Sequence, residues 1–282
     1  MKKILYSILA ILIIIFLILI YARFIGTIGL NTNEISYQTE YISESYNGLK
    51  IVHFTDLHYK KVITEKRVEE LIKEINKIKP DLILFTGDLL DKDYKINNKD
   101  ITFLIKQLSN LNSTYGNFAI LGDNDYGKEE TIKNIYIQSN FTLLENDYSI
   151  IYNENNDKIF IGGLSTSTYE EADINKVMTY FSNNQDIKFK IIMLHEPDYI
   201  DTILNNYNNI NLILAGHSIN GSINIPLIKY FLSPNGAKKY YQPYYKKSNT
   251  DIYISNGIGL NNLNFRLFNH PSINFYRFTK DD

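Results

Sequence analysis

The chain of 282 residues has 29 basic and 31 acidic side chains, a formal net charge of −2 at pH 7 with neutral His, and no cysteine. This near-neutral charge argues against a nucleic-acid partner bound by phosphate neutralisation, and a hydrophobic content of 44% excludes wholesale disorder. Without cysteine there are no disulfides, thiolate metal sites, iron–sulfur clusters or Cys nucleophiles.

The N-terminus carries an uncharged apolar run over residues 4–22. As a helix, such a run is long enough to cross a hydrocarbon core of about 30 Å. Lys2 and Lys3 precede it and Arg23 follows it, so the positive-inside rule predicts an extracytoplasmic domain. A cleaved signal peptide is the alternative, but the small-x-small cleavage pattern is missing after the run. We expect an uncleaved, single-pass anchor in the cell membrane, followed by a polar linker over 23–47 that includes alternating, strand-like pieces.

From residue 48 to residue 282, short apolar runs alternate with amphipathic stretches, which predicts a single α/β domain. Residues 64–78 have helical spacing with Thr64 as a candidate N-cap, and residues 148–162 have a hairpin pattern. Shorter helices are expected over 101–111, 128–138, 174–181 and 197–204. The expected strands are 51–55, 82–85, 118–121, 191–194, 212–215, 252–255, 264–268 and 273–278.

Each of the five central strands is followed at once by acidic or imidazole residues. Ligands of open α/β sheets bind beyond the carboxyl ends of the strands, so these side chains are expected to converge on one rim. Taken singly, an Asp after a strand is more often a turn or helix-cap residue, as for Asp123 and Asp91. As a set, which includes three of the five histidines, they favour metal binding. The six candidate ligands are Asp56, His58, Asp88, Asp123, His195 and His217.

Carboxylate and imidazole ligands without thiolate suit Mn, Fe, Zn or Ni. Glycines at positions 87, 122 and 216 would allow the backbone to turn sharply beside such ions. His53 lies inside a strand and is expected in the core.

The order of these motifs resembles that of the calcineurin-like metallophosphoesterases. The stretch 255–269 is similar to a membrane-anchored bacterial branch that includes relatives of the UDP-2,3-diacylglucosamine hydrolases. The resemblance covers about residues 48 to 279 and implies a four-layer αββα sandwich after the transmembrane helix. The matching elements are Asp56-Leu57-His58, Gly87-Asp88, Gly122-Asp123-Asn124-Asp125, His195 and Gly216-His217-Ser218-Ile219.

The resemblance also implies a reaction. Two divalent ions would activate a hydroxide that attacks phosphorus, as in a phosphodiesterase or pyrophosphatase acting near the membrane. The substrate would contain phosphate, and a lipid-linked phosphate fits the anchor. Asp56, His58 and Asp88 would hold the first ion, and Asp88 would bridge to a second ion held by Asp123, His195 and His217.

Three positions depart from the family pattern. Asp123 replaces an Asn ligand, so three carboxylates facing two divalent ions leave +1, where the family's two carboxylates leave +2. Ile219 replaces the last His, and the first ion then loses a ligand, so we expect the second site to be tighter. Asn124 replaces a His thought to protonate the leaving group, which Asn cannot do near neutral pH. Asn124 and Asp125 complete the candidate catalytic element.

These departures leave two functions open. The first is a metal-dependent phosphoester hydrolase. The second is a catalytically impaired relative that binds a phosphate-containing ligand or a protein partner. Six retained candidate ligands favour the hydrolase. Separately, the Lys- and Tyr-rich stretch 238–247 is expected to be a solvated loop, with contact to lipid head groups as the sharper alternative.

Overall fold

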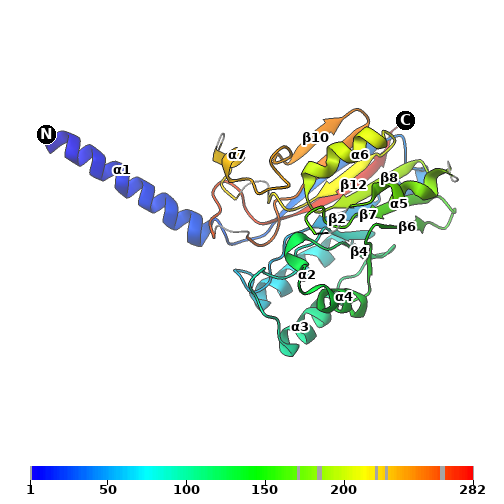
Figure 1. The fold of residues 1–282 in the computed structure, drawn as a ribbon, viewed down its shortest axis with the longest axis horizontal. Helices are drawn as coiled ribbons and strands as arrows, with labels where there is room; N and C mark the ends of the chain where they lie inside the picture. The colour runs from blue at the N-terminus through cyan, green and yellow to red at the C-terminus, as the bar shows by residue number, and fades with distance from the viewer. Residues whose placement is uncertain are drawn as a thin grey trace.

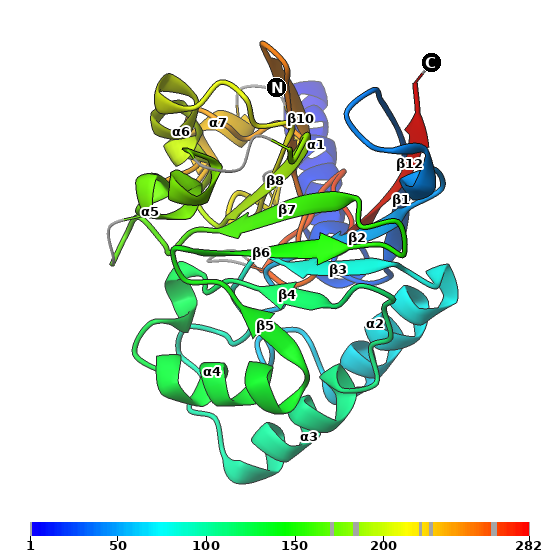
Figure 2. The ribbon, with the colours of Figure 1, turned by 90° about the vertical axis from the view of Figure 1, so that its right-hand side faces the viewer.

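The apolar runs of the sequence form two six-stranded sheets that face each other, with helices on both outer sides (Figures 1 and 2). The computed structural model describes residues 2–169, 172–182, 186–219, 222–225, 228–260 and 264–281. This is the predicted four-layer αββα sandwich.

The first sheet has the order β1-β12-β2-β3-β4-β5, and β2, β3 and β4 run parallel to one another. Its strands are β1 (Asn31–Thr39), β2 (Lys50–Phe54), β3 (Leu82–Phe85), β4 (Asn117–Ala119), β5 (Phe141–Leu143) and β12 (Ser272–Lys280). The helices on its outer face are α2 (Glu65–Ile78), α3 (Asn98–Leu108) and α4 (Glu129–Gln138).

The second sheet has the order β10-β11-β9-β8-β7-β6, and β8 pairs in parallel with β9. Its strands are β6 (Asp147–Tyr152), β7 (Lys158–Gly163), β8 (Phe189–Leu194), β9 (Leu212–Ala215), β10 (Tyr244–Lys247) and β11 (Thr250–Ile254). The predicted hairpin is confirmed as the antiparallel pair β6 and β7. On the outer face lie α5 (Ile174–Met178) and α6 (Ile200–Asn206), and a short helix α7 (Ile228–Leu232) precedes β10.

Apolar side chains fill the three spaces between the four layers. Local sequence signals determine where the helix α2 begins. The predicted N-cap is confirmed, because the Thr64 side chain accepts a hydrogen bond from the Arg67 amide at 3.4 Å. Its apolar residues recur at helical spacing and pack on the first sheet. His53 is fully buried in β2, as predicted.

Two predictions about local structure were wrong. The segment 23–47 is part of the domain and not a separate linker: its strand-like residues form β1, which pairs in parallel with β12 at the edge of the first sheet. Its end and the following turn are part of the core, since Tyr37, Ile42 and Tyr46 pack between the sheets. The strand expected over 264–268 is an isolated bridge between Leu267 and Ile223, because this segment turns to bury the Arg266 side chain.

The helix α1 (Lys2–Ile20), continued by a π-helical turn over Tyr21–Ile25, projects away from the sandwich (Figure 1). None of the α1 side chains is buried. In the described part of the chain it is the one helix long and apolar enough to span a membrane, a property that signal sequences share.

Candidate metal centre

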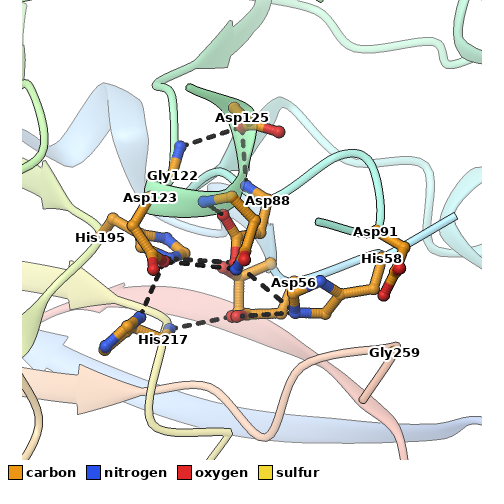
Figure 3. A network of polar contacts seen from close by, with 12 residues as sticks. Asp56, His58, Asp88, Asp91, Gly122, Asp123, Asp125, His195, His217 and Gly259 are labelled. Atoms are coloured by element: carbon orange, nitrogen blue, oxygen red, sulfur yellow. Dashed lines mark hydrogen bonds and ion pairs between the residues drawn. The ribbon is translucent and has the colours of Figure 1, made fainter. Parts of the chain in front are cut away.

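The six candidate ligands meet where the carboxyl ends of strands from both sheets face each other. β2, β3 and β4 supply residues from the first sheet, and β8 and β9 supply residues from the second. The close-up in Figure 3 shows their side chains converging from these separate strand ends. They form two groups that could each hold a metal ion: Asp56, His58 and Asp88, and Asp123, His195 and His217.

The first group is fully enclosed and contains two unsatisfied polar atoms. The Nε2 atom of His58 lies 3.5 Å from Oδ1 of Asp56 and 3.6 Å from Oδ2 of Asp88. Neither His58 Nε2 nor Asp56 Oδ1 has a hydrogen-bond partner among the described residues. Buried polar atoms are nearly always paired, so two orphans facing each other fit a cation between them.

The second group is centred on Asp123. Its Oδ1 atom lies 3.2 Å from Nε2 of His195 and 3.1 Å from Nδ1 of His217. His195 Nε2 is also 3.4 Å from Oδ2 of Asp88, the same oxygen that faces His58. Asp88 therefore lies between the two groups, as a bridging ligand must.

Backbone carbonyls orient both imidazoles of the second group. His195 Nδ1 lies 2.6 Å from the Thr86 carbonyl oxygen, and His217 Nε2 lies 2.6 Å from the Asn235 carbonyl oxygen. A carbonyl can only accept, so each of these nitrogens carries the proton. The lone pairs at His195 Nε2 and His217 Nδ1 are thereby directed at the centre of the group, as in many metal-binding histidines.

The buried carboxylates of the cluster stabilise positive charge on the groups next to them. Burial lowers the pKa of His58, but the nearby carboxylates of Asp56 and Asp88 outweigh burial and raise the pKa overall. The pKa values of His195 and His217 are likewise raised despite burial, by Asp88 and Asp123 for His195 and by Asp123 for His217. Burial raises the pKa of Asp56, yet His58 and His195 lower it overall to about 2. The same carboxylates would stabilise bound divalent cations.

The backbone bends sharply at the site. Asp56, His58, Asp88 and His217 adopt φ values of 52°, 44°, 62° and 62°, in the left-handed region. Such conformations cost about 1–3 kcal/mol each and cluster at functional sites. Gly216 allows the close approach of two strand ends, since a Cβ there would lie 2.7 Å from Oδ2 of Asp56.

Asn124 and Asp125, the two predicted catalytic residues, occupy different places. The Asn124 backbone amide donates to Asp88 Oδ1 at 2.8 Å, and its side-chain amide donates to Asp88 Oδ2. Asn124 is partly exposed beside both groups.

Asp125 points away from the ligand groups (Figure 3). Its carboxylate accepts the backbone amides of Asp88, Leu89 and Gly122, each at 2.9 Å. Burial, reinforced by the charge of Asp88, raises the pKa of Asp125 to about 7. The structure thus gives Asp125 the contacts of a positioning residue that joins two site loops.

Ile219 lies beside the first group. Its side chain is buried, and a Cβ at Gly257 would lie 3.0 Å from Asp56 Cβ and 3.5 Å from Ile219 Cγ2. Its φ of 48° is unusual for a β-branched residue. The backbone makes this turn although the Ile219 side chain offers no ligand atom.

Three contacting residues were not predicted from the sequence. Thr86 and Asn235 act through backbone carbonyls, which leave no trace in the side-chain pattern. Arg266 is fully buried, and its Nη2 donates to the carbonyls of Asn256, Gly257 and Gly259 at 2.6–3.0 Å. The Gly259 amide in turn donates to the Asp56 carbonyl at 2.7 Å. Arg266 thereby holds the loop that supports the first group.

Several known proteins resemble this chain. An uncharacterised metallophosphoesterase of Bacillus subtilis, YkuE, is 30% identical over 91% of this chain and 88% of its own length. An uncharacterised metallophosphoesterase of Campylobacter jejuni is 29% identical over 91% of this chain and 66% of its own. A zebrafish (Danio rerio) transmembrane protein with a metallophosphoesterase domain is 20% identical over 85% of this chain, which spans 55% of that protein.

Among solved structures, a sulfate thiohydrolase of Thermus thermophilus shares the fold, with a TM-score of 0.52 at 10% identity over 76% of this chain and 52% of the other. The sequence profile of the family described as calcineurin-like phosphoesterase matches residues 49–221, well over half of the chain. The match spans all six candidate ligands, and the chain belongs to this metallophosphoesterase family.

Proposed function

We propose that this chain is a membrane-anchored phosphoester hydrolase that uses two divalent metal ions. The observation that supports this most directly is the position of Asp88, whose Oδ2 atom lies 3.6 Å from His58 Nε2 and 3.4 Å from His195 Nε2. The two ligand groups thus share one carboxylate. Divalent ions in such a pair supply a nucleophilic hydroxide at neutral pH and stabilise the charge that develops on the phosphoryl group.

The roles of the chain's own residues follow from their contacts. Asp56 and His58 would hold one ion, and Asp123, His195 and His217 the other, with Asp88 common to both. Asp56 Oδ2 accepts the His217 amide at 2.9 Å, which ties the two groups together. The second site is the tighter one in this proposal, because Ile219 offers the first ion no ligand.

Charge determines when a phosphate can bind. Asp56, Asp88 and Asp123 contribute −3, so two divalent ions leave +1 and a single ion leaves −1. Productive binding of an anionic substrate therefore requires both ions. Asn124 can donate a hydrogen bond through its amide but cannot protonate a leaving group. The absence of this proton donor should slow hydrolysis least for diesters and diphosphates with good leaving groups.

The direction of the anchor and the substrate class complete the proposal. Lys2 and Lys3 at the start of α1, against Arg23 after it, favour an extracytoplasmic domain. A lipid-linked phosphodiester or diphosphate is the proposed substrate class, because it fits a domain that is anchored to the membrane by α1. The metal is Mn, Fe, Zn or Ni by ligand type.

The test is hydrolysis of bis(4-nitrophenyl) phosphate by the full chain in detergent micelles, with and without Mn²⁺. We expect metal-dependent turnover, with two metal ions per chain. Asp88→Asn keeps the size of the side chain but weakens a ligand of both groups. It should lower the rate by more than the ~10–100-fold typical of outer-shell changes. Equal rates for the original chain and the Asp88→Asn variant would contradict the proposal.

A second function has its own support. Asn124 and Ile219 stand where the resembled family has a proton donor and a ligand, so a binding protein without turnover remains the competing proposal. Its signature is metal bound to the original protein at both groups, no metal-dependent hydrolysis above the Asp88→Asn background, and retained affinity for a non-hydrolysable phosphate ester.

A further inference from the structure

We propose that an apolar collar around the end of α1 is seated in the lipid bilayer interface and holds the metal centre's rim against the membrane surface. The collar consists of Phe24, Ile28, Phe231, Leu232 and Phe268. This inference rests on the proposed membrane anchor, but it does not depend on hydrolytic turnover.

The collar residues come from three separate segments that meet at one place. The Arg266 amide donates to the Ala22 carbonyl at 2.8 Å, which fixes the 266–268 turn to the end of α1. The same turn is joined to the segment before α7, since the Asn224 amide donates to the Leu267 carbonyl at 2.9 Å. Figure 1 accordingly shows α7 beside the point where α1 joins the sandwich, and Figure 2 places both behind the sheets.

The collar side chains are unusually exposed to solvent for apolar residues in a folded domain. Phe231 is 75% exposed, Phe268 69% and Phe24 64%, and Ile28 and Leu232 are also exposed. Single exposed apolar residues are normal, but a cluster rooted in three segments indicates an interaction surface.

Continuity with α1 identifies the partner. Phe24 and Ile28 follow the apolar span directly, within one or two helical turns of its end, so any bilayer that contains α1 lies next to them. Phe and Leu side chains next to a basic residue are typical of segments that lie in a membrane interface, and the Arg23 guanidinium lies 5.4 Å from the Phe24 ring. If α1 spans a bilayer, lipid must lie next to the collar, and no further partner is needed to cover it.

The Lys- and Tyr-rich stretch 238–247 is a poorer candidate for this contact. Lys239 and Lys247 both pair with Asp201, and Lys246 pairs with Asp251 at 3.1 Å. Three of the four lysines in this stretch are thus already paired with carboxylates of the domain.

The collar is connected to the metal centre by a short piece of chain. Three residues after Leu232 comes Asn235, whose carbonyl accepts the Nε2–H of His217. The adjacent Gly236 approaches His217 closely, since a Cβ there would lie 3.4 Å from the imidazole Nε2. A collar seated in lipid would therefore bring this edge of the site to the membrane surface, where phosphate esters of bilayer lipids are the accessible substrates.

Because the chain contains no tryptophan, single Trp substitutions provide unique fluorescent reporters. The full chain, reconstituted at one copy per lipid nanodisc with a tryptophan-free scaffold, is compared as Phe231→Trp, Phe268→Trp, Phe16→Trp within α1, and Ile137→Trp on α4. Ile137 is 67% exposed and lies on a helix far from α1, so it is the matched control for an exposed apolar site (Figure 1). Nanodiscs carry lipids brominated either near the head group or along the acyl chains.

We expect head-group-proximal bromines to quench Phe231→Trp and Phe268→Trp, acyl-chain bromines to quench Phe16→Trp, and neither to quench Ile137→Trp. If Phe16→Trp is quenched while both collar variants behave like Ile137→Trp, the collar inference is overturned and the anchor stands. If Phe16→Trp is not quenched, the anchor itself fails, and the collar inference with it. Collar emission that shifts to the blue only with several copies per disc assigns the surface to a second copy of the chain and also overturns it.

Discussion

The imidazole Nε2 of His217 donates a hydrogen bond to the backbone carbonyl of Asn235, at 2.6 Å. This bond leaves the opposite nitrogen, Nδ1, facing Asp123 at 3.1 Å. His195 has the reverse arrangement, with Nδ1 bound to the Thr86 carbonyl and Nε2 facing the cluster. The two imidazoles of one candidate metal group are therefore held in opposite tautomers by different backbone segments.

Opposite tautomers predict opposite ligating nitrogens. In protein loaded with ¹¹³Cd, ¹⁵N NMR should show metal coupling to Nδ1 of His217 and to Nε2 of His195, because these atoms carry the free lone pairs. Substituting each histidine in turn by Gln assigns the signals. Coupling through the same ring nitrogen in both residues would contradict the hydrogen-bond assignment.

Asp125 is not a candidate metal ligand, but its contacts predict that it stabilises the fold. Asp125→Asn leaves one acceptor oxygen and places an NH₂ group against backbone N–H donors that now bind a carboxylate. Losing buried partners of this kind costs ~1–3 kcal/mol, so thermal or urea unfolding should show a clear loss. The matched control is Asp93→Asn, which removes the same charge at an exposed position and should shift stability by less than ~0.5 kcal/mol. Similar losses in both variants would rule out a positioning role for Asp125.

The convergence of the six candidate ligands could be expected from the sequence, because parallel strands deliver their carboxyl-terminal residues to one rim. The regular α2 helix was equally accessible, since its apolar spacing and its Thr64 cap are local signals.

Other features depend on contacts that side-chain patterns do not encode. The strand β1 acquires its place only by pairing with β12, at the opposite end of the chain. Asn235 takes part through its carbonyl oxygen, which any residue could provide. The turn at 264–268 depends on the buried Arg266, whose tertiary contacts override a strand-like apolar pattern.

Metal removal should reverse the dependence of stability on pH. The pKa values of His58, His195 and His217 are raised in the folded protein, so their contribution is present below about pH 6.5 and is lost as pH rises through the folded values. The raised pKa of Asp125, about 7, acts in the same direction. Metal ions instead require unprotonated imidazoles, so their stabilisation grows with pH.

Melting temperatures measured from about pH 7 to about pH 9 should therefore fall in EDTA and fall less, or rise, with saturating Mn²⁺. In this window the buried His53, whose pKa burial lowers to about 3, is neutral in the folded protein and mostly neutral in the unfolded one, so it adds little slope. Parallel curves with and without metal would show that the cluster does not bind it.

Ile219→His should strengthen the first metal site. The introduced imidazole replaces a side chain without ligand atoms next to Asp56, and His tolerates the φ of 48° better than a β-branched residue. Outer-shell partners alone are worth ~10–100-fold in affinity, so a direct ligand should raise the first-site affinity by at least ~10-fold. Ile219→Leu relieves the β-branching without adding a ligand and serves as the control. Calorimetric titration with Mn²⁺ should show two comparable sites only in the His variant, and a matching gain in the Leu variant would assign the effect to strain.

Asn124→His should restore general-acid assistance and reveal which substrates need it. The backbone amide of residue 124 donates to Asp88 Oδ1 at 2.8 Å, a contact that the substitution leaves in place. A positioned proton donor contributes ~10²–10⁴-fold, so turnover of an alkyl phosphodiester should rise by a factor in this range, with rates declining at high pH as the introduced imidazole loses its proton. Bis(4-nitrophenyl) phosphate, whose leaving group needs no protonation, should change little. Asn124→Gln keeps an amide and should show neither gain. A uniform gain for both esters would mean that the imidazole acts on substrate binding, and not on the leaving group.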